Sequence, residues 1–272
     1  MSAGSPAAQH VSLEWDERGG VTVHMDGSPQ SHVQPDDPTL LVFEYVQHLA
    51  LAIGALPPGP VGVTHVGGAG LTLPRWVEAT RPGSPQIVLE PDEALTALVR
   101  KEIPLPRRHR IRVRPVDGLT GVRALGDDSA DVVVTDAYAA GRVPAELSST
   151  AYVLEIARVL KPEGTALWNL ADEPGMRYVA RVLVTVRKAL PHVALIATHE
   201  VLKGKRFGNS VVVASAAPLP MQTLRREVAR ANLPTGLREG GGLERLIAGA
   251  KPLDDKGMPS PPPPEAGRWR AR

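Results

Sequence analysis

The feature that most constrains the fold of this chain is a regular alternation of short apolar runs with helical segments. Each apolar run is followed by a segment whose apolar residues recur at the spacing of an α-helix. Parallel strands need a crossover connection, which is usually a helix, so this rhythm predicts a mostly parallel, doubly wound α/β sheet. The predicted strands are Val61–Val66, Gln86–Leu89, Ile111–Val116, Ala130–Thr135 and Thr165–Leu170.

The alternation stops after a helix predicted for residues 175–190. Two β-prone runs follow, His192–Thr198 and Ser210–Ser215, and the segment between them leaves no room for a helix. We therefore expect these last two strands to pair antiparallel. A mostly parallel sheet that ends in an antiparallel hairpin resembles the Rossmann-like class I methyltransferase fold.

The two ends of the chain differ from this central part. Val11–Trp15 and Val21–Met25 are β-prone runs joined through Gly19-Gly20, which predicts a small N-terminal β-hairpin, followed by a polar loop at 26–38. Helices are predicted at 39–56 and 221–233. The resulting organisation is an N-terminal β-hairpin region at 1–38, a central Rossmann-like domain at 39–233, and a Pro-rich C-terminal extension at 234–272 that we expect to be disordered. The resemblance of the central domain to the class I methyltransferase fold implies a nucleoside-binding transferase domain.

Composition narrows the possible functions. The chain has no cysteine, which excludes disulfides, thiolate metal sites and thiol nucleophiles, and we expect no metal. The arginine-rich run at 107–114 alternates with Ile111 and Val113 as a half-exposed strand does, so nucleic acid is not the expected partner. No apolar run approaches the ~20 residues of a membrane span, and residues 1–6 lack a signal pattern. We expect a soluble, cytoplasmic protein.

A glycine-rich turn marks the expected ligand site. Gly67, Gly68 and Gly70 lie between the first predicted strand of the sheet and the next helix. Glycines let the backbone approach a ligand closely, and a helix N-terminus offers unpaired N–H donors. Ligands bind at this position in doubly wound sheets, although a tight turn without a ligand is the alternative.

Three acidic residues, Glu90, Asp117 and Asp136, follow neighbouring predicted strands. The carboxyl ends of parallel strands meet at one edge, so these carboxylates should lie near the glycine turn. Glu90 comes roughly 20 residues after Gly67, where a carboxylate accepts both ribose hydroxyls of a nucleoside; capping the next helix is the alternative, which suits Asp92 better. Asp117 could accept the amine of a base or cap the helix predicted at 119–125.

Several segments resemble the spermidine synthase family, a branch of the class I S-adenosylmethionine-dependent transferases. The resemblance runs from about Val11 to about Ser215 and therefore includes the N-terminal hairpin. It implies transfer of an aminopropyl group from decarboxylated S-adenosylmethionine to an amine, in polyamine biosynthesis, by a homodimer. The segments are Phe43-Glu44-Tyr45-Val46-Gln47, Gly67 to Arg75, Val88 to Asp92, Asp136-Ala137-Tyr138, and Arg158 to Thr165, the last shared with S-adenosylmethionine-type transferases in general.

The resemblance also implies roles for individual residues. Asp136 would act as the base that frees the acceptor's amine, or would orient it, and Tyr45 and Tyr138 would bind the acceptor. Asp172, which follows the fifth predicted strand, is a candidate further anion for the acceptor, with a helix cap as the alternative. The donor, decarboxylated S-adenosylmethionine or S-adenosylmethionine, would contact Gln30, Gly67, Gly68, Gly70, Glu90 and Asp117.

The chain departs from the family at three acidic positions, where it has Gly70, Ala139 and Gln47, and at a histidine position, where it has Val46. Loss of an anion at Gly70 removes repulsion against the methionine carboxylate, so an S-adenosylmethionine-dependent methyltransferase is an alternative. Against it, His65 stands where methyltransferases usually place an acidic residue. A non-catalytic nucleoside-binding relative is the third interpretation, and all three remain open at this point.

Overall fold

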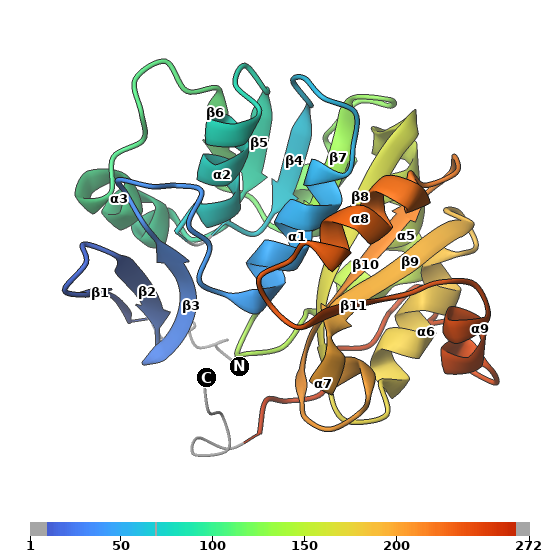
Figure 1. Ribbon diagram of the computed structural model, residues 1–272. Helices are drawn as coiled ribbons and strands as arrows, with labels where there is room; N and C mark the ends of the chain where they lie inside the picture. Colours follow the sequence, from blue (N-terminus) through green and yellow to red (C-terminus); the bar gives the residue numbers. More distant parts are fainter. Residues whose placement is uncertain (1–9, 69, 265–272) are drawn as a thin grey trace, which may run out of the picture.

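The computed structural model describes residues 10–68 and 70–264 and contains one eight-stranded sheet at its centre (Figure 1). The strand order is β11-β9-β10-β8-β7-β4-β5-β6, and the five strands from β4 to β8 are parallel to one another, as predicted. Because the order in which strands are added to the sheet reverses between β4 and β7, the carboxyl ends of these two strands form the switch point at the sheet's centre. The parallel strands are β4 (Val63–Val66), β5 (Gln86–Leu89), β6 (Ile111–Arg114), β7 (Ala130–Thr135) and β8 (Leu160–Asp172).

The other side of the sheet is antiparallel, which confirms the expected final hairpin. Strand β9 (His192–Thr198) pairs antiparallel with β10 (Gly208–Ser215), and β10 pairs antiparallel with β8. The expectation that no helix fits between β9 and β10 is wrong, since the one-turn helix α7 (His199–Leu202) lies there. Four residues make one helical turn without changing the antiparallel connection.

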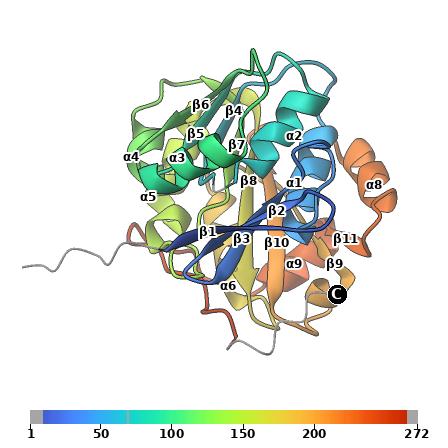
Figure 2. The same cartoon turned by 90° about the vertical axis from the view of Figure 1, so that its left-hand side faces the viewer.

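Helices cover both faces of the sheet (Figure 2). Apolar residues of one helical set pack with β4, β7, β8 and β10 on one face, and a second set packs on the opposite face. The first set is α1 (Glu44–Gly54), α2 (Thr72–Thr80) and α8 (Met221–Ala229); the second is α4 (Gly118–Arg123), α5 (Thr150–Val159), α6 (Arg177–Val186) and α9 (Gly240–Ile247). No helix in the described part of the chain is long and apolar enough to cross a membrane.

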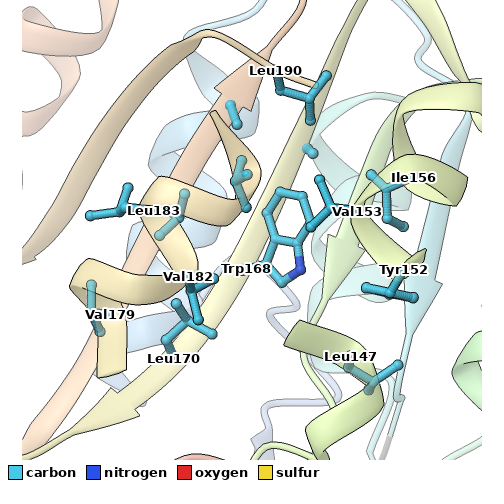
Figure 3. Close-up of a cluster of buried hydrophobic side chains, with 14 of the residues drawn as sticks. Leu147, Tyr152, Val153, Ile156, Trp168, Leu170, Val179, Val182, Leu183 and Leu190 are labelled. Carbon is cyan, nitrogen blue, oxygen red and sulfur yellow. The ribbon is translucent and has the colours of Figure 1, made fainter. Parts of the chain in front are cut away.

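The larger apolar cluster is organised around Trp168, which is fully buried on β8 (Figure 3). Val153 and Ile156 of α5 and Val182 of α6 close around its ring (Figure 3). Aliphatic side chains supply most of the remaining contacts, as expected for a sequence with 4% aromatic residues. This packing fixes β8 against α5 and α6 and so determines where the loop at its end lies.

The N-terminal region forms three strands rather than a hairpin. Strands β1 (Val11–Trp15), β2 (Val21–Met25) and β3 (Ser28–Val33) make an antiparallel sheet, and β3 lies within the segment predicted as a polar loop. The turn between β2 and β3 is Asp26-Gly27, with φ values of 50° and 75°. Asp-Gly is a strong hairpin signal, and a shift in register between Val23 and His24 accommodates the irregular strand. Helix α3 (Glu93–Glu102) packs against this sheet through a shared apolar cluster.

Residues 234–264 of the C-terminal extension contain a strand, a helix and buried side chains, where the Pro-rich composition predicts disorder. The extension adds the edge strand β11 (Thr235–Arg238) beside β9, and then α9. Residues 251–264, hereafter the C-terminal strap, have no regular secondary structure, yet Leu253 and Ser260 are buried. The Pro-rich composition predicts disorder because it gives no sign of the buried apolar residues and the backbone hydrogen bonds that hold this segment. Residues 265–272 lie outside the described residues.

Candidate functional site

The glycine turn after β4 lies directly against the end of β7. Gly67 has a φ of 86°, and its N–H donates to the carbonyl of Leu89 at 2.9 Å. A Cβ at this position would lie 2.2 Å from the carbonyl oxygen of Asp136, so only glycine allows this approach. The structure thereby brings the turn and Asp136 together, as the topology predicts.

Glu90 joins the end of β5 to the same turn. Its Oε2 accepts a hydrogen bond from the N–H of Gly68 at 3.0 Å, and its Oε1 accepts from the N–H of Asp92 at 3.1 Å. Asp92 is the N-cap of α3 and accepts from the N–H of Leu95 at 2.8 Å. The two acids therefore divide as expected, with Asp92 capping the helix and Glu90 at the glycine turn. Ribose binding by Glu90 stays a prediction.

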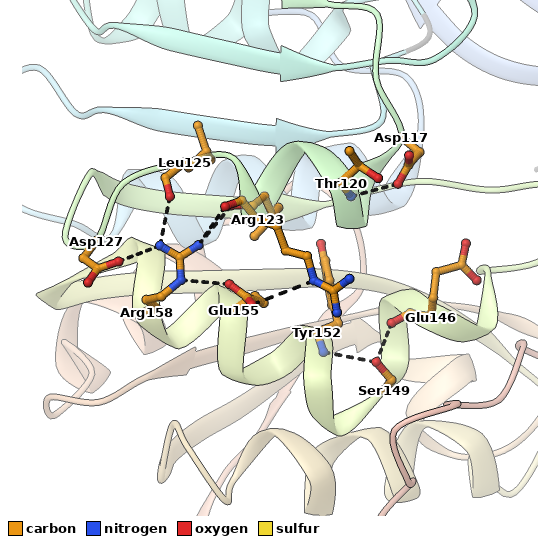
Figure 4. Close-up of polar contacts among 11 residues, drawn as sticks. Asp117, Thr120, Arg123, Leu125, Asp127, Glu146, Ser149, Tyr152, Glu155 and Arg158 are labelled. Carbon is orange, nitrogen blue, oxygen red and sulfur yellow. Dashed lines mark hydrogen bonds and ion pairs between the residues drawn. The ribbon is translucent and has the colours of Figure 1, made fainter.

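Asp117 is the N-cap of α4 (Figure 4). Its carboxylate accepts from the backbone N–H of Thr120 at 2.9 Å, and hydrogen bonds from the backbone and side chain of Thr120 hold its pKa below the ordinary value. Arg158, on α5, donates to the carbonyl of Leu125, just after the end of α4 (Figure 4). The helix-cap alternative for Asp117 is thus present, and contact with a base stays a prediction.

Asp136 belongs to a hydrogen-bonded group of four side chains. Its Oδ1 accepts from Nδ2 of Asn169 on β8 at 2.9 Å. Nδ2 of Asn209, on β10, donates to Oδ1 of Asn169 and to the Tyr138 hydroxyl, each at 3.0 Å. The Tyr138 hydroxyl donates in turn to the backbone carbonyl of Asn169 at 3.3 Å. Burial raises the pKa of Asp136 to about 6, and the bond from Asn169 opposes that rise.

Tyr45 approaches this group from another element and is bonded to Gln30. The Tyr45 hydroxyl, at the start of α1, donates to the backbone carbonyl of Gln30 on β3 at 3.1 Å. Burial, reinforced by the charge of Asp136, raises the pKa of both Tyr45 and Tyr138 well above the usual range. Both hydroxyls therefore remain neutral hydrogen-bond donors beside the one carboxylate.

Gly70 lies under the N-terminal sheet. Its N–H donates to Oγ of Ser31 on β3 at 2.9 Å, and Oγ1 of Thr72 donates to the carbonyl of His32 at 2.9 Å. A Cβ on Gly70 would lie 2.5 Å from Ser31 Oγ and 3.0 Å from Cγ2 of Val33. The glycine is thus explained by contact with β3, and its N–H bonds to the protein rather than pointing to a ligand.

Asp172 is not part of the Asp136 group, contrary to its predicted role in acceptor binding. It is three residues beyond Asn169 on β8, so its side chain projects from the opposite face of the sheet. There it accepts from the N–H of Glu173 at 2.8 Å and from the N–H of Val179, in the first turn of α6, at 2.9 Å. The helix-cap alternative describes its observed contacts.

Asn169 and Asn209 are the site residues that sequence reasoning missed. Asn169 interrupts the apolar run at 166–171 and is 1% exposed, which is a usable signal, because a buried amide needs partners. Asn209 carries no comparable signal, since its role depends on which strand lies beside β8. The described residues contain no group of three or more His, Cys, Asp or Glu side chains placed to hold a metal ion.

Solved structures identify the class of this fold. Neither a protein-family model nor a curated protein matches the sequence. Human methyltransferase-like protein 13, solved in complex with SAH, matches with a TM-score of 0.56 and 18% identity, over 78% of this chain and 96% of that one. Together with the parallel sheet and its antiparallel end, this match defines a Rossmann-like class I methyltransferase fold.

Within that class, a probable spermidine synthase from Corynebacterium glutamicum matches with a TM-score of 0.84 and 25% identity, over 92% of this chain and 94% of that one. Spermidine synthase from Thermotoga maritima matches with a TM-score of 0.58 and 16% identity, over 94% and 85% of the two chains. The chain therefore has a spermidine-synthase-like fold, as the sequence resemblance indicates.

Proposed function

We propose that this protein is a transferase that uses an S-adenosyl nucleoside and moves an aminopropyl group from decarboxylated S-adenosylmethionine to a small amine. The observation that carries the proposal is the Asp136 carboxylate. It lies against the glycine turn, accepts a hydrogen bond from Asn169 and has a pKa of about 6. A carboxylate with this pKa is largely ionised at neutral pH and is closer to the operating pH than an ordinary aspartate, which suits a general base.

The reaction needs an unprotonated amine aligned behind the reacting carbon. The acceptor's ammonium gives its proton to Asp136, and the freed nitrogen lone pair forms a C–N bond to the carbon beside the sulfonium. The C–S bond breaks, and its electron pair moves onto the sulfur, which becomes a neutral thioether. Tyr45 and Tyr138 flank the carboxylate as neutral donors, so their role would be to orient the acceptor, which is largely a positioning task.

The donor would bind at the glycine turn. Gly67 and Gly68 allow close approach of the backbone, and Glu90 would accept the ribose hydroxyls, because each carboxylate oxygen can accept more than one hydrogen bond. Asp117 would contact the base from the start of α4. The SAH complex of methyltransferase-like protein 13 supports a nucleoside of this type.

A methyltransferase is the second candidate, and Gly70 is the observation that favours it. The space beside Gly70 is filled by Ser31 and Val33, so no carboxylate can stand there to repel the carboxylate of S-adenosylmethionine. His65 disfavours a methyltransferase, because it stands where methyltransferases usually place an acidic residue. His65 is buried at the end of β4, is bonded through Nε2 to Oε1 of Gln86 at 2.9 Å, and has a pKa lowered to about 4 by burial.

Calorimetry of the full chain with decarboxylated S-adenosylmethionine and with S-adenosylmethionine separates the two candidates. We expect tighter binding of the decarboxylated donor and, by mass spectrometry, aminopropylated products from a panel of primary amines. Asp136→Asn should reduce turnover by about 10²- to 10⁴-fold and leave nucleoside binding intact. Tighter binding of S-adenosylmethionine with methylated products would establish the methyltransferase instead, and binding without any turnover would indicate a non-catalytic protein.

A further inference from the structure

The C-terminal strap lies along the loop that follows β7. This β7–α5 loop, residues 136–149, begins with Asp136 and Tyr138 and contains the 3₁₀ helix η1 (Ala145–Ser148). Ser260 and Val143 bond each other twice: the Ser260 N–H donates to the Val143 carbonyl at 3.2 Å, and the Val143 N–H donates to Ser260 Oγ at 2.9 Å. Nε of Arg142 also donates to the Ser260 carbonyl, at 2.5 Å.

Ser260 is well suited to this contact because of its neighbours. Ser260 is fully buried, and the remaining five residues from 259 to 264 are all prolines. Proline has no backbone N–H, so Ser260 provides the one backbone donor of this hexapeptide, and that donor binds the loop. The fixed φ angles of the prolines also reduce the conformational entropy that the strap loses on docking.

The strap holds the second half of the loop as well. Ser148 Oγ donates to the Met258 carbonyl at 2.8 Å, and Thr150, at the start of α5, donates through Oγ1 to the Leu253 carbonyl at 2.7 Å. Gly257 has a φ of 68°, and a Cβ there would lie 1.9 Å from the carbonyl oxygen of Ala145. The strap and the loop are therefore in backbone contact, which a side chain at 257 would prevent.

The strap is itself fixed to the body of the protein. The Leu253 N–H donates to Oγ1 of Thr185 on α6 at 2.8 Å, and Nε of Arg181 donates to the Lys251 carbonyl at 3.1 Å. The Leu253 side chain is 2% exposed and belongs to the apolar cluster around Trp168. A loop bonded to the strap is thereby bonded to α6 and to the core.

A short path links this contact to the site. Ala139 and Arg142 exchange two backbone hydrogen bonds, at 2.8 and 3.0 Å, and so form a tight turn next to Tyr138. Tyr138 bonds with Asn209 and with the backbone of Asn169, whose side chain donates to Asp136. A displacement at residues 142–143 would therefore move Tyr138 and alter the surroundings of the carboxylate.

We propose that Ser260 is a positioning residue: through Val143 and Arg142, the C-terminal strap holds the β7–α5 loop in the conformation in which Asp136 and Tyr138 face the acceptor. The acceptor's place in this statement rests on the proposed function. The holding of the loop and the surroundings of Asp136 do not, and both can be measured without any substrate.

The experiment compares Ser260→Ala with Lys256→Ala in the full chain. Ser260→Ala removes the acceptor of the buried Val143 N–H, whereas the Lys256 side chain is exposed and lies in the same strap. Hydrogen exchange followed by mass spectrometry reports the loop, and carbon-13 NMR of labelled aspartate reports the pKa of Asp136, with Asp136→Asn assigning its signal. Losing one such bond corresponds to about 5- to 150-fold in an equilibrium constant.

We expect Ser260→Ala to speed exchange at residues 137–149 by at least about 5-fold, with β9 and α1 unchanged, and Lys256→Ala to change neither readout. The pKa of Asp136 should fall from about 6 toward 3.8, because a looser loop lets water reach the carboxylate. An unchanged pKa would overturn the proposal, even with faster loop exchange, because the strap would then be purely structural. Equal acceleration of exchange throughout the chain would overturn it too. Failure of the proposed function would appear separately, as wild-type protein that transfers no group.

Discussion

At the scale of single residues, the ionisation of Asp136 links stability to function. The pKa of its carboxyl is about 6 in the folded protein, above the ordinary 3.8, chiefly because of burial. Folding therefore favours the protonated form. The ionised carboxylate lowers stability at pH values above 6, and this penalty disappears as the pH falls through 6 toward 4.

Asp136→Asn should for this reason stabilise the protein while it reduces the proposed transfer activity. We expect a gain of about 1–3 kcal/mol in unfolding free energy at pH 8, since one pKa unit corresponds to about 1.4 kcal/mol. The gain should shrink toward zero at pH 4, where the wild-type carboxyl is protonated in both states. Urea unfolding at the two pH values measures it. A variant less stable than wild type at pH 8 would contradict the assigned burial of this charge.

Asn169→Leu should shift the pH dependence of the site. The Asn169 side chain donates to the ionised form of Asp136 and so lowers its pKa; without that bond, the pKa should rise above 6. The acid limb of the pH–rate profile, or the aspartate NMR titration, would move to higher pH. Ser210→Ala is the control, because this buried hydroxyl of β10 bonds only the Leu170 carbonyl among the contacts described. A shift of equal size in both variants would refute the specific role of Asn169.

The sequence predicts part of this site and misses part of it, for one physical reason. Glu90, Asp117 and Asp136 end consecutive parallel strands, so topology alone brings them to one edge of the sheet. Asp172 also ends a strand, but the alternation of side chains along β8 turns it to the opposite face. Asn209 depends on the pairing of β10 with β8, and contacts between strands distant in sequence leave no local pattern.

At the scale of elements, the end of α1 is held by a buried arginine of α2's C-terminus. Arg81 is 8% exposed, and its two Nη atoms donate to four backbone carbonyls, those of Ile53, Leu56, Pro57 and Gly59, at 2.7–3.0 Å. The last carbonyls of a helix have no partner within the helix. Arg81 donates to one of these, that of Ile53, and to three carbonyls of the segment that follows α1. Because Tyr45 lies at the other end of α1, the contact also fixes the position of a site residue.

Arg81→Ala should therefore destabilise the protein by about 2–4 kcal/mol, since this buried side chain holds four backbone carbonyls, one of them buried. The stability of Arg81→Lys should lie between those of the wild type and Arg81→Ala, because an ammonium is a donor but lacks the planar fork of donors of a guanidinium. Arg187→Ala provides a matched control. Arg187 forms a partly exposed ion pair with Glu244 at 2.9 Å, and such a pair contributes about 0–1 kcal/mol. Equal losses in urea unfolding for Arg81→Ala and Arg187→Ala would refute the capping role.

Elements with strong local signals were predicted well, and those defined by their neighbours were not. Strands β5, β7 and β9 have the predicted limits, because their apolar runs are bounded by charged or turn residues. Strand β11 was missed because Thr235–Arg238 has no apolar alternation and forms only by pairing with β9. Strand β3 was missed because Pro29 and its polar neighbours masked a strand that the Asp26-Gly27 turn defines.

At the scale of the whole molecule, the N-terminal sheet packs against the glycine turn through hydrogen bonds and apolar contacts. Gly70 and Thr72 bond with Ser31 and His32, and a shared apolar cluster connects Val23 with the glycine-turn side of the sheet. The sheet that carries Gln30 and the turn expected to hold the donor therefore move as one unit.

Gly70→Ala should disturb this junction, since the new Cβ would lie 2.5 Å from Ser31 Oγ. We expect a loss of about 1–3 kcal/mol, typical of overpacking, together with faster proteolysis within residues 10–38. Gly126→Ala is the control, because nothing lies within 4 Å of a Cβ there. The double variant Gly70→Ala, Ser31→Gly should recover part of the loss. No difference between Gly70→Ala and Gly126→Ala would show that the junction tolerates a side chain.

The C-terminal strap has a consequence for the order of events during synthesis. Val143 emerges from the ribosome 117 residues before its partner Ser260. At about 5–20 residues per second, roughly 6–23 s pass between the two. During that time the centre of the sheet can assemble, but the loop that carries Asp136 cannot yet bond with Ser260. Nascent chains released before residue 260 would thus contain all the parallel strands but lack the contact that holds the β7–α5 loop in place.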